Sequence, residues 1–105
     1  MIRVHVQYPN SDDAKFDMDY YLSKHMPMVA EKCGDALKNW TVESGLSGGM
    51  GGNPPANIAT GTLEFESVDA FAAAMGPHMP EIMGDIPNYT DIAPVMQISE
   101  VVVEK

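Results

Sequence analysis

The sequence is poor in cysteine and in long apolar runs. Cys33 is the only cysteine among 105 residues, so no disulfide can form within the chain. No stretch approaches the roughly 18 apolar residues of a membrane span, and the opening "MIRVHVQYP" lacks the basic and apolar regions of a signal peptide. We therefore expect a cytoplasmic protein with no membrane partner.

Basic residues are also scarce. The chain has 6 of them against 15 acidic residues, which gives a net charge of −9. Nucleic acids and anionic membranes bind basic patches, so this charge argues against both as partners. It does not indicate a cationic substrate, because acidic surfaces mostly serve solubility.

The spacings typical of metal and nucleotide sites are missing. His5, His25 and His78 form no HxH, HxxxH or HExxH pattern, and one cysteine gives no CxxC, so we expect no metal held by the protein. The Gly- and Pro-rich segment 48–56 has neither GxGxxG nor Walker spacing and predicts a hairpin loop. Haem needs a single axial histidine, so the ligand count leaves haem open.

Apolar residues make up 45% of the chain, which is enough for the core of one domain spanning residues 1–105. Residue periodicity predicts strands at 2–8, 37–47, 57–67 and 95–104. It predicts helices at 17–33 and 68–75, with one or two further helical turns near 81–86. The order βαββαβ predicts an α+β, ferredoxin-like fold. Its four-stranded antiparallel sheet would carry two helices on one face.

Local signals define the ends of the two helices. Asp17 can cap the first helix, and Phe16 and Tyr21 have the spacing of a hydrophobic staple. Gly34 fits a C-cap, and Ser67 can cap the second helix.

The second face of the sheet is expected to be apolar. The residues that support this are Trp40, Val42, Leu63, Phe65, Val101 and Val103, which we do not expect to face the helices all at once. A second copy of the sheet would cover such a face, so we expect a homodimer through the open sheet face.

The stretch "YYLSKHMPMV" is the strongest candidate for a site. Pro27 cannot donate a backbone hydrogen bond to the carbonyl of Ser23, which predicts a kink beside His25. A histidine in an apolar cleft can act as acid or base near neutral pH. Alternatively, His25 only donates to a freed carbonyl and closes the kink.

Helical spacing puts Tyr21, Leu22 and Val29 on the same face as His25. His78, between two prolines, is expected at a helix junction, and two helices on one face of a small sheet could bring it close to His25. Asp85 could be an acid/base partner, although an aspartate before "IPN" is more simply explained as turn chemistry.

Three segments together carry a family resemblance. The stretches "VQYPN", "FDMDYYLSKHMPMV" and "GDIPNYTDIAPVMQISEV" resemble the EthD family, named after ethyl tert-butyl ether degradation, over nearly the whole chain. The resemblance implies a dimeric α/β-barrel with a cleft between helices and sheet. It also implies membership of the dimeric α/β-barrel superfamily, which includes cofactor-free monooxygenases, polyketide cyclases, haem-degrading enzymes and stress-response proteins. The recurrent histidine of the family matches His25, and its tyrosines match Tyr20 and Tyr21.

Three functions remain open at this point. The first is a cofactor-free enzyme that oxidises, isomerises or cyclises a small apolar or aromatic molecule. Its catalytic residues would be His25 and Tyr21, and its substrate-binding residues would be Tyr8, Tyr20, Leu22, Val29 and His78. The second is a non-catalytic binding or accessory protein of an oxygenase system, and the third is a haem-binding relative with His25 as axial ligand.

Overall fold

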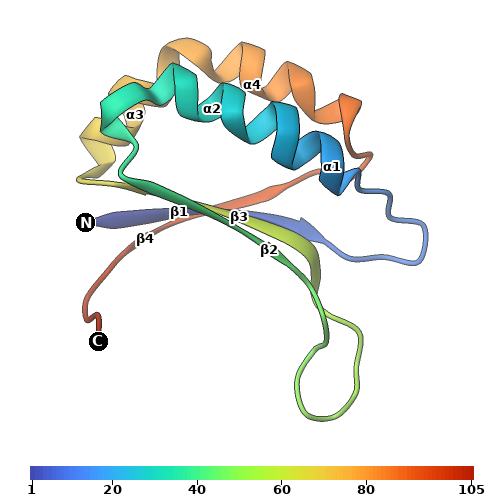
Figure 1. The fold of residues 1–105 in the computed structure, drawn as a ribbon. Helices are drawn as coiled ribbons and strands as arrows, with labels where there is room; N and C mark the ends of the chain where they lie inside the picture. Colours follow the sequence, from blue (N-terminus) through green and yellow to red (C-terminus); the bar gives the residue numbers. More distant parts are fainter.

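A computed structural model describes all residues from 1 to 105 and contains one four-stranded sheet. The strands are β1 (Ile2–Pro9), β2 (Asn39–Ser44), β3 (Asn57–Phe65) and β4 (Val95–Glu100). They are antiparallel in the order β2-β3-β1-β4, and all helices cover one face (Figure 1). This confirms the predicted α+β, ferredoxin-like fold.

Two rows of helical segments lie side by side on the sheet and form one layer (Figure 1). The first contains α1 (Met18–Tyr20), the π-helical turn η1 (Tyr21–His25), α2 (Met26–Cys33) and the 3₁₀ turn η2 (Gly34–Ala36). The second contains α3 (Val68–Met75), the 3₁₀ turn η3 (Gly76–His78), α4 (Met79–Asp85) and the 3₁₀ turn η4 (Ile86–Asn88). No helix reaches the length and apolarity that crossing a bilayer requires.

The predicted helix ends are confirmed. The side chain of Asp17 accepts a hydrogen bond from the amide of Tyr20 at 3.1 Å, and Ser67 caps α3 in the same way. The rings of Phe16 and Tyr21 lie 5.0 Å apart, as a staple requires. Gly34 ends α2 with a φ of 58°, a conformation that glycine adopts without strain.

The helix irregularity expected near Pro27 takes the form of the π-helical turn η1. The amide of Met26 donates to the carbonyl of Tyr21, five residues back rather than four. The wider turn directs Tyr21 and His25 into the core, where both are buried, while Leu22 remains 43% exposed. The π-helical turn directly before Pro27 therefore determines which side chains of this helix face the sheet.

The strands alternate as a sheet covered on one side should. In β3, Ala59, Gly61, Leu63 and Phe65 are buried and their neighbours are only half-buried. Tyr8 and Tyr21 meet between the layers, and each is only 1% exposed. The core therefore lies between sheet and helices, and its aromatic end is formed by β1 and η1.

The expectation of an apolar open face is wrong for the four of its six residues that lie in strands, while Val101 and Val103 follow the end of β4. Trp40 pairs with Leu63 and Val42 with Gly61, and directly paired residues project from the same side of a sheet. Trp40 and Val42 therefore lie on the helix side, together with the buried Leu63 and Phe65. The open face instead presents polar residues, among them Arg3, His5, Gln7, Thr41, Thr60, Thr62, Glu64, Gln97 and Ser99.

Candidate active site

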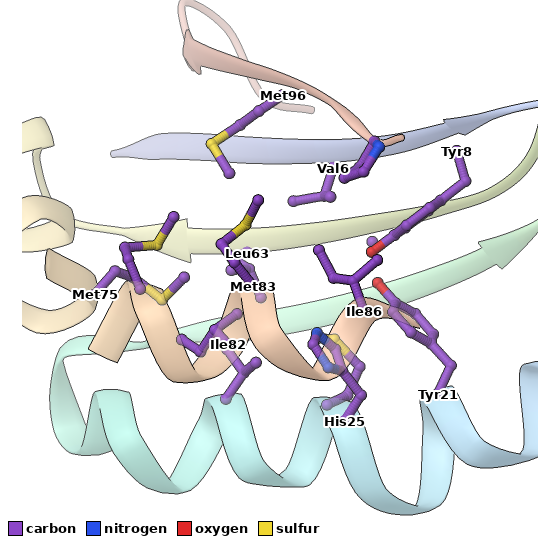
Figure 2. A pocket seen from close by; sticks show the side chains of 15 residues that line it. Val6, Tyr8, Tyr21, His25, Leu63, Met75, Ile82, Met83, Ile86 and Met96 are labelled. Atoms are coloured by element: carbon purple, nitrogen blue, oxygen red, sulfur yellow. The ribbon is translucent and has the colours of Figure 1, made fainter. Parts of the chain in front are cut away.

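A cavity of about 150 Å³ lies between the helices and the sheet (Figure 2). Fifteen residues line it: Val6, Tyr8, Tyr21, His25, Met26, Val29, Gly61, Leu63, Met75, Met79, Ile82, Met83, Ile86, Pro94 and Met96. None of them is acidic, lysine or arginine. The cavity is therefore apolar, and its polar side-chain groups come from two tyrosines and one histidine.

His25 is placed in this wall by the π-helical turn and is only 4% exposed. Its Nδ1 lies 2.9 Å from Oδ2 of Asp85, at the end of α4. The other oxygen of Asp85 accepts hydrogen bonds from the hydroxyl of Tyr20 at 2.6 Å and from Nδ2 of Asn88 at 2.9 Å. Every partner of Asp85 therefore supports its charged form.

The electrostatics assign the proton between this pair. Burial alone would raise the pKa of Asp85, but the hydrogen bonds from Tyr20, Asn88 and His25 outweigh it and lower that pKa. Burial lowers the pKa of His25 despite the nearby carboxylate. At neutral pH, Asp85 is therefore an acceptor only, and a neutral His25 carries its proton on Nδ1. Nε2, which keeps its lone pair, is therefore the basic atom of the ring.

One tyrosine hydroxyl lies near that atom and is hydrogen-bonded to a second. The Tyr89 hydroxyl lies 3.4 Å from Nε2 of His25, longer than an ordinary hydrogen bond from a hydroxyl, and 2.7 Å from the hydroxyl of Tyr8. Burial raises the pKa values of Tyr8, Tyr21 and Tyr89. All three phenols therefore remain protonated and can donate.

Tyr21 fills a space that only glycine leaves. Its ring stacks on the imidazole of His25 with centroids 5.4 Å apart and planes 13° from parallel. Its hydroxyl reaches β3 at Gly61, where an added Cβ would collide with it. That hydroxyl lies near Tyr8 (Figure 2), and its interaction with Tyr8 adds to burial in raising the pKa of Tyr21.

The structure brings four of the predicted site residues together at the cavity: Tyr8, Tyr21, His25 and Val29. Tyr20 is not among the lining residues, and its hydroxyl donates a hydrogen bond to Asp85 instead. Leu22 is turned towards solvent by the π-helical turn. His78 lies in η3, is not among the lining residues, and forms no hydrogen bond with His25.

Of the three further residues around His25, the sequence offered Asp85 as a possible acid/base partner and gave no indication of Asn88 or Tyr89. Asp85, explained from the sequence more simply as a turn residue, is the partner of His25, and Asn88 and Tyr89 complete its surroundings. All three lie in the motif "DIPNYT", which carried the family resemblance. That motif was the available signal.

The side chains around His25 suit neither a metal ion nor haem. No three His, Cys, Asp or Glu side chains are grouped so that they could hold a metal ion. A cavity of about 150 Å³ has the size of one that binds a single benzene ring, whereas a porphyrin has four pyrrole rings. The residues around His25 therefore do not fit haem.

The comparisons with known proteins agree with this architecture. The chain is 53% identical to an EthD-like protein from Ralstonia eutropha JMP134, whose crystal structure superposes with a TM-score of 0.93 over 99% of this chain and 94% of that one. The chain belongs to the EthD-like family. No family model matches the sequence.

Other relatives are more distant. An uncharacterised 11.0 kDa protein in the thcB–thcC intergenic region of Rhodococcus erythropolis is 33% identical over 91 residues, or 85% of this chain and 84% of that protein. An EthD family protein from Bacillus halodurans C-125 has a TM-score of 0.64 at 16% identity, over 95% of this chain and 97% of that one. HapK from Hahella chejuensis has the same TM-score at 8% identity, over 100% of this chain and 96% of that one. These last two likenesses concern the fold alone.

Proposed function

We propose that this EthD-like protein is a cofactor-free enzyme that removes a proton from a small, apolar or aromatic molecule. The observation that carries the proposal is the 2.9 Å pair of His25 and Asp85 at the wall of an apolar cavity. A buried histidine oriented by an ionised carboxylate is the arrangement that general base catalysis uses.

The chemical step is a proton transfer to Nε2 of His25. The O–H or C–H bond of the substrate breaks, its electron pair stays on the substrate, and an N–H bond forms on the imidazole. Asp85 stabilises the resulting imidazolium and holds the ring in the required tautomer. Tyr21 and Tyr8 donate hydrogen bonds to the substrate oxygen on which negative charge develops.

The anion formed in this step is a common intermediate of isomerisation, cyclisation and oxidation by dioxygen. An oxidoreductase or degradation-related role is therefore one outcome of the same proton transfer. The products distinguish oxidation from the other two reactions. Isomerisation and cyclisation leave the substrate mass unchanged, whereas oxidation consumes dioxygen.

The test compares wild type with His25→Gln on a panel of single-ring phenols and cyclic ketones. Substrate loss is followed by chromatography coupled to mass spectrometry, which separates isomers of equal mass, and dioxygen is followed by an electrode. We expect turnover to fall roughly 10²- to 10⁴-fold in His25→Gln, the usual contribution of a general base. His5→Gln is the matched control, because His5 bonds Thr62 on the open sheet face and should leave turnover intact. Turnover that survives His25→Gln would contradict the proposal.

The second candidate is a protein that binds or delivers a small molecule without converting it. The predominance of apolar side chains supports this reading, since 12 of the 15 lining residues are hydrophobic. Binding by the purified protein with no product over a long incubation would favour it over the enzyme.

We also propose a homodimer through the open sheet face. The support comes from apolar side chains that frame this polar face, rather than from the face itself. The β2–β3 loop and the C-terminal tail both bend to the side of the sheet away from the helices (Figure 1). They carry the highly exposed Leu46, Met50, Val102 and Val103, which a second copy would cover.

A further inference from the structure

The cavity offers no charged partner to a ligand. Its lining contains no lysine, arginine, aspartate or glutamate, and its histidine is neutral at pH 7. The nearest charge, on Asp85, lies behind His25 and is already bonded to three donors. An ionised ligand would lose its hydration without compensation, so the chamber selects a neutral molecule.

Size limits the ligand next. A cavity of about 150 Å³ lined by apolar side chains is known to hold one benzene molecule. Met83 and Met96 line this cavity and are 46% and 42% exposed, which places the entrance between α4 and β4. The closed end at Tyr21 and His25 therefore accommodates one ring.

The lining favours an aromatic ring over an aliphatic one. Five of the nine methionines of the chain line the cavity, namely Met26, Met75, Met79, Met83 and Met96. Thioether sulfur makes favourable contacts with aromatic rings, and methionine adapts its shape to them. The labelled methionines in Figure 2 come from both the helical layer and the sheet, so a ring could be contacted from two sides.

Hydrogen bonding determines the substituent. The Tyr21 hydroxyl has Tyr8 as its partner, and Nε2 of His25 is an acceptor with only a 3.4 Å contact to the Tyr89 hydroxyl. A bound ligand that offers better geometry can replace both contacts. A hydroxyl group can accept from Tyr21 and donate to Nε2. An ether or a ketone can only accept, which would leave Nε2 with nothing better than its long contact to Tyr89.

We propose that the cavity binds a neutral single-ring phenol, whose hydroxyl accepts a hydrogen bond from Tyr21 and donates one to Nε2 of His25. The inference rests on the proposed function, since the phenolic proton is then the one that His25 removes. It goes further by naming the substrate class and by excluding ethers as ligands of equal affinity.

The experiment uses three probes that differ in one group: p-cresol, 4-methylanisole and toluene. Protein labelled with ¹³C at the methionine methyl groups is titrated at pH 7 and observed by NMR. We expect the five lining methionines to shift with p-cresol, while Met1, Met18, Met28 and Met50 serve as internal controls outside the lining. p-Cresol should bind roughly 3- to 100-fold more tightly than the other two probes, the effect of one or two hydrogen bonds.

Tyr21→Phe isolates the donor. It should lower the affinity for p-cresol several-fold and leave that for toluene unchanged, because the ring and its packing remain. His78→Ala, outside the cavity, should change neither affinity. Equal affinities for p-cresol and 4-methylanisole, or no response of the lining methionines up to millimolar probe, would overturn the inference.

The two proposals fail in different ways. Tight binding of p-cresol with no turnover of any phenol contradicts the proposed enzyme and supports the ligand class. Turnover of cyclic ketones by wild type, lost in His25→Gln and without phenol binding, supports the enzyme and contradicts the ligand class.

Discussion

His25 and Asp85 lie 60 residues apart in the chain and are joined by a hydrogen bond of 2.9 Å. The first comes from η1 and the second from the end of α4, so the pair connects the two rows of helices at the wall of the cavity. Since Asp85 is held ionised by Tyr20 and Asn88, it controls which nitrogen of His25 carries the proton. The basicity of the site thus depends on a contact between elements that are distant in sequence.

Asp85→Asn should lower the pKa of His25 further. Burial already lowers it, and the carboxylate is the group that opposes this effect, so its neutralisation removes the opposition. The measurement is an NMR titration of the His25 ring nitrogens. If a substrate is found, turnover should also fall by roughly 10²-fold or more.

Asp12→Asn is the control for this substitution. Asp12 is exposed in the loop after β1 and has no contact with the site, so the His25 titration should match that of wild type. An unchanged titration in Asp85→Asn would show that the carboxylate does not determine the protonation of His25.

His25 should make stability depend on pH. Its pKa is lowered from the model-compound value of 6.5, so the unfolded chain takes up a proton before the folded one does. The contribution is complete above about pH 6.5 and is lost progressively as the pH falls towards the folded pKa. Asp85, whose pKa is lowered from 3.8, loses its own contribution only at more acidic pH.

Urea unfolding at pH 8, 7, 6 and 5 tests this dependence. The free energy of unfolding of wild type should decline between pH 7 and pH 5 more steeply than that of His25→Gln. The comparison uses the slope with pH, because the substitution also changes packing at every pH. Parallel slopes in the two proteins would contradict the prediction.

The fold could be predicted because its signals are local. Alternation in β1 and β3, the caps at Asp17 and Ser67, and the C-cap at Gly34 are each written in neighbouring residues. The two faces of the sheet could not be assigned this way. Alternation separates Trp40 from Thr41, but only the register with Leu63 shows that Trp40 lies on the helix side.

The candidate site also has residues that the sequence predicts and residues that it does not. His25 and Tyr21 were predicted from one stretch around Pro27, and both line the cavity. Leu22 was misplaced because a period of 3.6 residues does not hold through a π-helical turn. Asp85 gave no local signal of its role, since a partner 60 residues away is found only after the helices have packed.

The dimer can be tested by light scattering at micromolar concentration. We expect a mass twice that of the 11.4 kDa chain. Replacing Leu46 and Met50 by serine should weaken association, because both side chains are exposed on the β2–β3 loop. Leu22→Ser is the matched control on the helical layer, and it should keep the dimer mass. A monomer mass for wild type would contradict the proposal.

Gly61 and Tyr21 should be coupled in stability and in binding. A Cβ at position 61 would collide with the Tyr21 hydroxyl, so Gly61→Ala has to displace the phenol or the strand. Overpacking of this kind costs roughly 1–3 kcal/mol in the free energy of unfolding. The displaced ring would also lose its stacking on His25, so Gly61→Ala should weaken p-cresol binding.

The double variant Gly61→Ala/Tyr21→Phe tests the cause. Without the hydroxyl, the nearest tyrosine atom to the new Cβ is Cζ at 3.5 Å, an ordinary van der Waals contact. The double variant should therefore be more stable than Gly61→Ala alone, with a coupling energy of roughly 0.5–3 kcal/mol in a double-mutant cycle. Gly84→Ala is the control, because nothing lies within 4 Å of its added Cβ, and it should be neutral or slightly stabilising. Additive effects of Gly61→Ala and Tyr21→Phe would show that β3 does not need glycine to admit the hydroxyl.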